Sequence, residues 1–261
     1  MDVWELIDII EKYAPLNFAA SWDKSGLLVL GEKEDIQKVA ISLEPSLSAV
    51  NKALDWGANF LLTHHPLALH PEFPNKKNEY FYVLKKVLSS GMFLYSAHTS
   101  LDANSKGPVS WFAKELGLQN LRVIDSFLDV DEKGTVGFGL RGEFSARIKT
   151  VDFIHKVKSI LGIDILRAIG KAPSNIKHVA YCPGSGASLA EKAFKLGVDV
   201  FITGDFKYHE ALEVGFQGFV LDVGHFILEE MMMQYFYKDI AKNIKEVDFI
   251  FIQSKDPFCY L

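Results

Sequence analysis

Short runs of apolar residues alternate along this chain with longer segments whose apolar positions recur every three or four residues. The short runs are typical of buried strands, and the longer segments are typical of amphipathic helices. This alternation predicts an α/β fold in which helices flank the sheets. In the first half, the pattern predicts helices over residues 3–13, 46–56, 80–89 and 109–116, and strands over residues 39–43, 60–63 and 93–97.

The second half begins with a segment in which two predicted strands follow each other without a helix between them. Two strands of alternating polarity are predicted on either side of a turn at Asp131, Glu132, Lys133 and Gly134. A helix from about residue 150 to 161 and a short strand near residues 164–168 follow them. Further along, the pattern predicts a helix over residues 227–244 and a strand over residues 247–253.

One pattern of strand, loop, helix, glycine and strand occurs twice, 140 positions apart. Residues 39–63 align without a gap on residues 179–203, and Gly57 and Gly197 fall where a left-handed helix cap is favoured. Residues 91–98 likewise parallel residues 218–225. We therefore predict two related α/β halves from an internal duplication, with a metal site between them. The predicted boundaries are 1–121, completed by the C-terminal helix and strand, and 122–261.

Composition is that of a well-packed globular protein. Of the 261 residues, 49% are hydrophobic and 23% are charged. The length is sufficient for one large domain or two small ones. Two cysteines cannot form a disulfide framework and favour a reducing compartment. The N-terminal segment lacks a basic stretch, and no apolar run approaches the roughly 18 residues of a membrane span. We expect a soluble, cytoplasmic protein.

The charge distribution argues against general nucleic-acid binding. The formal net charge is −5, and the lysines do not concentrate in any one stretch. A nucleic-acid interface usually needs clustered lysine and arginine and a basic overall charge. We therefore do not expect nucleic acid as a general partner, and binding through a local basic patch stays the alternative.

Polar side chains follow several predicted strands at their carboxyl ends, where open α/β sheets place ligands. His64 and His65 follow the strand at 60–63, and Pro66 prevents that strand from continuing. His98 and His225 each precede a carboxylate by four residues, in 98–102 (HTSLD) and 225–229 (HFILE). For His225 and Glu229, which lie at a predicted helix start, this spacing places both side chains on one face.

A lone histidine after a strand is usually a surface or core-edge residue. Three such groups, all at strand ends and related by an internal repeat, favour metal binding. Neighbouring imidazoles that reach different ions suit a dinuclear centre. A set of imidazoles and carboxylates without thiolates favours two divalent ions of Zn, Fe, Mn, Co or Ni.

These motifs together resemble the Nif-three-like proteins, a family also labelled GTP cyclohydrolase 1 type 2 homologues. The resemblance spans nearly the whole chain through the motifs 21–27 (SWDKSGL), 63–66 (THHP), 98–102 (HTSLD), 184–186 (GSG), 203–205 (TGD) and 224–229 (GHFILE). It implies a dinuclear site with bridging carboxylate and water, and a homohexameric ring that encloses a cavity. At 261 residues the chain is the short form without the family's insertion domain. The metal ligands that the resemblance implies are His64, His65, Asp102, His225 and Glu229.

Three features have two interpretations each. By the repeat His98 is a metal ligand, whereas the resemblance makes it a residue that orients a bound water or substrate, which we favour. Trp22 is either a stacking face at the site or an ordinary buried tryptophan. The glycines of 184–186 either present backbone N–H groups to an anion or allow tight packing between helix and strand.

The predicted function is that of a metal-dependent hydrolase. Two metal ions lower the pKa of a bridging water, so no protein nucleophile is required. His98 or His209 is the candidate catalytic residue that transfers a proton. The substrate class is a phosphoester, a nucleotide, or a cyclic amide or amidine. The alternative is a non-enzymatic metal-binding scaffold or regulator that acts through protein partners.

Overall fold

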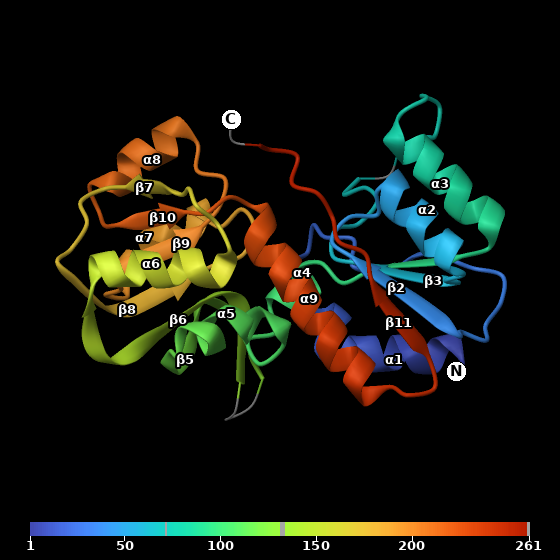
Figure 1. The fold of residues 1–261 in the computed structure, drawn as a ribbon, viewed down its shortest axis with the longest axis horizontal. Coiled ribbons are helices and arrows are strands. Elements are labelled where there is room, and N and C mark those ends of the chain that lie inside the picture. The colour runs from blue at the N-terminus through green and yellow to red at the C-terminus, as the bar shows by residue number, and fades with distance from the viewer. Residues whose placement is uncertain (71, 131–133, 260–261) are drawn as a thin grey trace. The chain divides into compact units, whose positions relative to one another are not determined.

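A computed structural model describes residues 1–70, 72–130 and 134–259. The chain divides into two compact units. Unit 1 comprises Met1–Asn104 and Met233–Leu261, and unit 2 comprises Ser105–Met232. Each unit is built on its own mixed sheet with helices on it (Figure 1).

The sheet of unit 1 has five strands in the order β1-β4-β3-β2-β11. The four strands β4, β3, β2 and β11 run parallel, and β1 pairs antiparallel with β4. The last strand of the chain therefore lies beside the second one, as Figure 1 shows for the red β11 and the blue β2. The strands are β1 (Gly26–Val29), β2 (Lys38–Ser42), β3 (Phe60–Thr63), β4 (Phe93–Ser96) and β11 (Asp248–Phe251).

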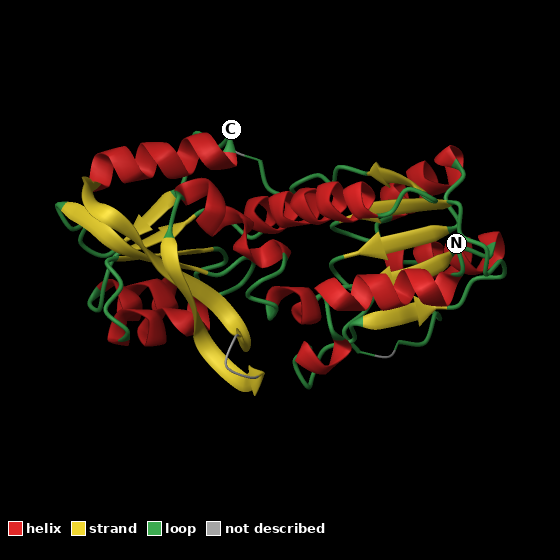
Figure 2. Cartoon of the chain, turned by 90° about the horizontal axis from the view of Figure 1, so that it is seen from below, coloured by secondary structure: helices red, strands yellow, loops and turns green. Residues whose placement is uncertain are grey.

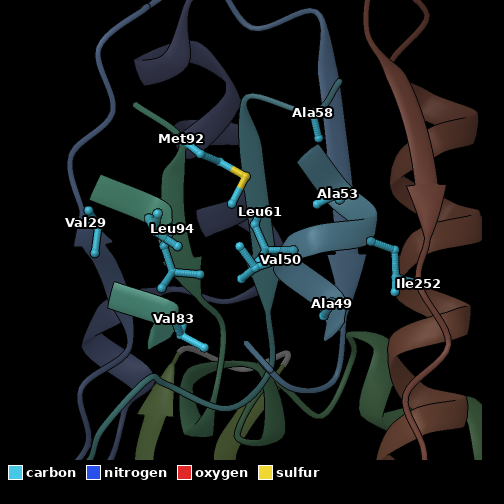
Figure 3. Packing of buried hydrophobic residues seen from close by; sticks show 12 residues of the cluster. Val29, Ala49, Val50, Ala53, Ala58, Leu61, Val83, Met92, Leu94 and Ile252 are labelled. Atoms are coloured by element: carbon cyan, nitrogen blue, oxygen red, sulfur yellow. The ribbon is translucent and has the colours of Figure 1, made fainter. Parts of the chain in front are cut away.

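Both faces of the central strands in unit 1 are buried, as is typical of parallel strands that helices cover. On one face, Leu61 and Leu94 of the sheet pack with Val50 of α2 and Val83 of α3 (Figure 3). On the other face, Tyr95 donates a hydrogen bond to Glu11 of α1. The helices of unit 1 are α1 (Val3–Tyr13), α2 (Leu47–Trp56), α3 (Glu79–Ser90) and the short α4 (Thr99–Asp102).

Helix α2 has a clear start and a clear stop. The Ser46 hydroxyl accepts a hydrogen bond from the backbone N–H of Ala49, which satisfies one of the free donors of the first turn. Gly57 ends the helix in the left-handed conformation at φ 86°. These two residues fix the short loops that connect β2 and β3 to the helix.

The sheet of unit 2 has six strands in the order β5-β6-β8-β9-β10-β7. The strands β8, β9 and β10 run parallel, and the long antiparallel strands β5 and β6 form the extended pair seen in Figure 2. The strands are β5 (Gln119–Val130), β6 (Gly134–Lys149), β7 (Arg167–Ile169), β8 (Asn175–Tyr181), β9 (Val200–Thr203) and β10 (Val220–Asp222).

Helices cover both faces of the parallel strands in unit 2. On one face, Ala180 and Phe201 of the sheet pack with Ala193 of α7 and Val214 of α8. On the other, Tyr181 contacts Phe112 of α5 edge to face at 5.3 Å. The helices are α5 (Trp111–Leu116), α6 (Thr150–Leu161), α7 (Ala190–Lys195) and α8 (Tyr208–Gly215), and α9 (Phe226–Asn243) starts in this unit.

The predicted fold class, α/β with two sheets flanked by helices, is confirmed, and every predicted helix is present to within a few residues. The predicted strand near residues 164–168 lies at Arg167–Ile169. The predicted turn at 131–133 lies outside the described residues. Strand β1 and helix α8 were not predicted, because both are short and partly exposed and therefore carry a weak periodic signal.

Over the described part of the chain, none of the helices combines the length and the apolar character that a bilayer crossing requires.

Candidate metal centre

In unit 1 the carboxyl ends of β3 and β4 bring three histidines together. Thr63 and Ser96 are partners in the parallel register, so the residues that follow them leave the sheet at the same edge. The backbone N–H of His65 donates to the carbonyl of Leu43, which ties the loop after β3 to the end of β2. The loop geometry therefore follows from strand pairing.

The imidazole rings of His64, His65 and His98 form a compact triangle. Their centroids lie 5.0 Å apart for His64 and His65, 5.2 Å for His64 and His98, and 5.5 Å for His65 and His98. One ring nitrogen of each lies within 4.8 Å of the others. His64 is fully buried, and the other two are partly exposed. The three side chains can therefore hold a metal ion.

Each ring of this triangle has its Nδ1 atom against a protein oxygen. The Nδ1 of His64 lies 2.8 Å from the carbonyl oxygen of Ala97, and that of His65 lies 2.8 Å from a carboxylate oxygen of Glu44. The Nδ1 of His98 lies 2.7 Å from Asp23. An Nδ1–H donor to such an oxygen leaves Nε2 as the acceptor, which is the arrangement found around metal-binding histidines. The donor set therefore fits a transition metal.

Asp102, on α4, adds a carboxylate to this cluster. Its Oδ1 atom lies 3.7 Å from Nε2 of His64. In the sequence Asp102 follows His98 by four residues, and the short helix that begins after His98 places it back toward the edge of the sheet. The imidazole of His64, which follows β3, and the carboxylate of Asp102, on the helix that follows β4, thus lie close together.

The loop before β1 holds Asp23 against His98. Burial of the Asp23 carboxyl by itself raises its pKa, but hydrogen bonds from His98, Ser25 and Thr99 outweigh burial and hold that pKa below its usual range. Trp22 is 55% exposed, and its ring meets the ring of His98 edge to face at 5.9 Å. The interpretation of Trp22 as a buried core residue is therefore wrong.

In unit 2, His225 and Glu229 form a pair at the start of α9. Nε2 of His225 lies 2.9 Å from Oε2 of Glu229, and its Nδ1 lies 2.6 Å from Asp205. Burial lowers the pKa of His225, but the two carboxylates outweigh burial and raise that pKa to about 9. Glu229 is only 4% exposed. Glu229 thus lies at Nε2 of the ring and Asp205 at Nδ1, and both carboxylates stabilise the protonated imidazole.

The glycine loop after β8 provides room for Glu229. Gly184 has φ +64°, and a Cβ atom at that position would overlap Oε1 of Glu229 and lie 3.4 Å from Cε1 of His225. The N–H of Gly186 donates to the hydroxyl of Thr203 at 2.9 Å. The N–H of Gly186 is thus used inside the protein, which supports the packing interpretation of these glycines over anion binding.

His209 lies at the exposed start of α8. Its ring packs edge to face against Tyr208 at 5.4 Å, and it has no hydrogen bond or ion pair with any residue in the described part of the chain. Neither Glu44 nor Asp205 was predicted from the sequence as an orienting carboxylate. Only Asp205 had a signal, because Gly204-Asp205 occupies the repeat position of His64-His65.

Relatives of known sequence match the chain over its full length. A Clostridium perfringens protein named "GTP cyclohydrolase 1 type 2 homolog" is 31% identical over 267 residues, which cover 100% of both chains. A Staphylococcus aureus protein with the same name is 23% identical over 368 aligned positions, again with full coverage of both. Since this chain has 261 residues, at least 107 of those positions (368 − 261) hold residues of the relative alone. This chain is therefore the short form.

Solved structures share the fold. A Bacillus cereus protein related to NIF3 superposes with a TM-score of 0.90 at 22% identity, over 100% of this chain and 99% of the other. A Staphylococcus aureus hypothetical protein gives a TM-score of 0.87 at 27% identity, with the same coverage. The model of one protein family matches residues 1–257. The chain belongs to that family, Duf34/NIF3 (NGG1p interacting factor 3).

Proposed function

We propose that this protein is a metal-dependent hydrolase that binds two divalent transition-metal ions through His64, His65, Asp102, His225 and Glu229. The observation that carries the proposal is the orientation of the imidazoles. His64, His65 and His225 each have Nδ1 against a carbonyl or carboxylate oxygen, so that Nε2 is the nitrogen available to a metal ion. The assignment to two ions rests on the sequence motifs of the family.

Bound metal ions would lower the pKa of a water toward neutrality and polarise the bond under attack. The protein's own residues would then handle the proton. His98 can take up a proton at Nε2, because the Asp23 carboxylate at Nδ1 stabilises the resulting imidazolium. Trp22, exposed beside His98, offers a flat apolar face for a substrate ring. His209 is the second candidate for proton transfer, on sequence grounds alone.

The substrate class that suits this chemistry is a phosphoester, a nucleotide, or a cyclic amide or amidine. The name of the curated relatives, "GTP cyclohydrolase 1 type 2 homolog", brings GTP ring opening into the same range of hydrolytic reactions. We also propose that the protein forms a homo-oligomer, a hexameric ring, in which the metal sites face an enclosed cavity. Such an enclosure would restrict the substrates to small molecules.

Elemental analysis of protein purified without added metal, with the oligomeric mass measured on the same sample, is the decisive first experiment. About two transition-metal ions per chain, together with turnover of a phosphoester or nucleotide that stops on chelation and returns on metal addition, would support the proposal. Metal near zero, with none regained on reconstitution, would contradict it. His65→Ala serves as the inactive control.

The alternative is a metal-binding scaffold that acts through protein partners. The family description, NGG1p interacting factor 3, names an interaction, and the large apolar side chains of Tyr208 and Leu212 on α8 and of Phe216 directly after it are exposed. Two bound metals with no hydrolysis of any substrate class above would favour this alternative. Retained partner capture by His65→Ala would then separate the scaffold role from the metal.

A further inference from the structure

Two arginines face each other on the long strands of unit 2. Arg122 of β5 and Arg141 of β6 are direct partners in the antiparallel register. Directly opposed residues project from the same face of a sheet, and like charges in such a pair destabilise it. Arg122 is exposed and Arg141 is half-buried, so an anion that reaches both would relieve this repulsion.

The two arginines line a cavity of about 370 Å³ in unit 2. This volume lies within the range of small-molecule sites, roughly 300 to 1,000 Å³. Polar groups make up most of the wall, together with the turn at residues 196–198 between α7 and β9. The polar lining residues are Asn120, Arg122, Arg141, Glu143 and His178.

The carboxylates of Glu143 and Asp199, near this cavity, already interact with other groups of the protein. Glu143 accepts a hydrogen bond from Asn120 at 2.7 Å and lies 3.5 Å from Nζ of Lys177 and 3.3 Å from Nε2 of His178. Asp199 accepts the backbone N–H groups of Lys177 and His178, each at 2.8 Å. The hydrogen bond from Asn120 and the charge of Lys177 also keep the pKa of Glu143 below its usual range, so Glu143 is ionised.

The arginines themselves have no such partners. Among residues 1–70, 72–130 and 134–259, neither Arg122 nor Arg141 has an ion pair or a side-chain hydrogen bond. The Nε–H of Arg141 is buried without an acceptor. Buried donors are almost always satisfied in folded proteins, so this group points to an acceptor that the protein does not supply.

We propose that this cavity binds the phosphate group of a small phosphorylated molecule, with Arg122 and Arg141 as its two ligands. A planar guanidinium group can donate two hydrogen bonds to the oxygens of one phosphate. A phosphate dianion between the two arginines would also compensate the repulsion between their charges. Glu143 and the amide of Asn120 lie on the same wall and are bonded to each other, which leaves the two arginines as the groups open to the phosphate. This site consists of residues outside the candidate metal centre.

Calorimetric titration of the full-length protein with inorganic phosphate at low ionic strength tests the proposal. We expect one phosphate per chain at this site and at least a tenfold loss of affinity in Arg122→Gln and in Arg141→Gln. Arg147→Gln is the matched control, because Arg147 is on the same strand, is exposed and does not line the cavity. It should bind phosphate as the wild type does.

A second variant separates this site from the metal centre. His65→Ala should keep the phosphate affinity of the wild type. The proposal fails if the wild type does not bind phosphate, if Arg147→Gln and Arg141→Gln lose affinity equally, or if His65→Ala abolishes a binding event that Arg141→Gln retains.

A measurement without phosphate distinguishes a binding role from a structural one. Arg141→Gln removes one of two opposed like charges, so its thermal midpoint in phosphate-free buffer should equal or exceed that of the wild type. Added phosphate should raise the midpoint of the wild type and leave that of the variant unchanged. A lower midpoint of Arg141→Gln without phosphate would mean that the arginine holds the fold together, and would overturn the assignment.

Discussion

The Nδ1 atom of His65 lies 2.8 Å from a carboxylate oxygen of Glu44, which fixes the ring of a proposed metal ligand from a loop 21 residues earlier in the chain. The carboxylate holds the orientation of the imidazole. We expect Glu44→Gln to weaken metal binding by about 10- to 100-fold without unfolding the protein. Competition with a coloured chelator measures the affinity, and Glu34→Gln, an exposed change in unit 1, is the control.

Removing a proposed ligand should have a larger effect than removing its orienting partner. His65→Ala or Glu229→Ala should abolish binding of at least one metal ion while the protein stays folded. Elemental analysis gives the metal content, and circular dichroism with the oligomeric mass reports on the fold. Two metal ions per chain in both variants would contradict the ligand assignment.

His98 should behave differently from the ligands. The family motifs imply that His98 is not a ligand, and the exposed Trp22 lies against its ring, so we propose that His98 acts on water or substrate. His98→Gln should therefore keep its metal and lose turnover by about 100-fold or more, as expected when a general acid or base is removed. A variant that loses metal in proportion to activity would make His98 a ligand.

Part of the architecture could be predicted from the sequence because the central strands are buried on both faces. Val39 pairs with Phe60 in unit 1, and Val179 pairs with Val200 in unit 2, so both pairings repeat at the offset of 140 seen in the sequence. Continuous apolar runs produce a strong signal, and the glycines after the helices mark their ends.

The hydropathy pattern could not predict the loops that follow β4 and β10. The last residue of β3 pairs with Ser96, and the last residue of β9 pairs with Asp222. His98 follows Ser96 by two residues, whereas His225 follows Asp222 by three. A difference of one residue beyond a strand end leaves no trace in hydropathy, yet it gives the two histidines different positions relative to their sheets.

The orienting role of these groups could not be predicted from the sequence, although Asp23 lies in the motif 21–27 that carries the family resemblance and was expected to make a polar contact near the site. Glu44 and Asp23 reach their histidines from loops, where no periodicity constrains the direction of a side chain. The backbone carbonyl of Ala97, which receives His64, has no sequence signature at all. Motifs therefore predicted candidate ligands, and only the structure identified what holds them.

Gly184 gives a further test, because its effect on the proposed site can be separated from its effect on the backbone. Gly184 and Gly197 both adopt the left-handed conformation, so alanine at either position should cost about 1–2 kcal/mol of stability. A Cβ at Gly197 meets nothing within 4 Å, whereas a Cβ at Gly184 would displace the carboxylate of Glu229. We therefore expect Gly197→Ala to keep its full metal content and Gly184→Ala to lose metal. Elemental analysis and thermal unfolding of the two variants would measure both effects, and equal metal content in the two would show that Glu229 does not hold a metal ion from its present position.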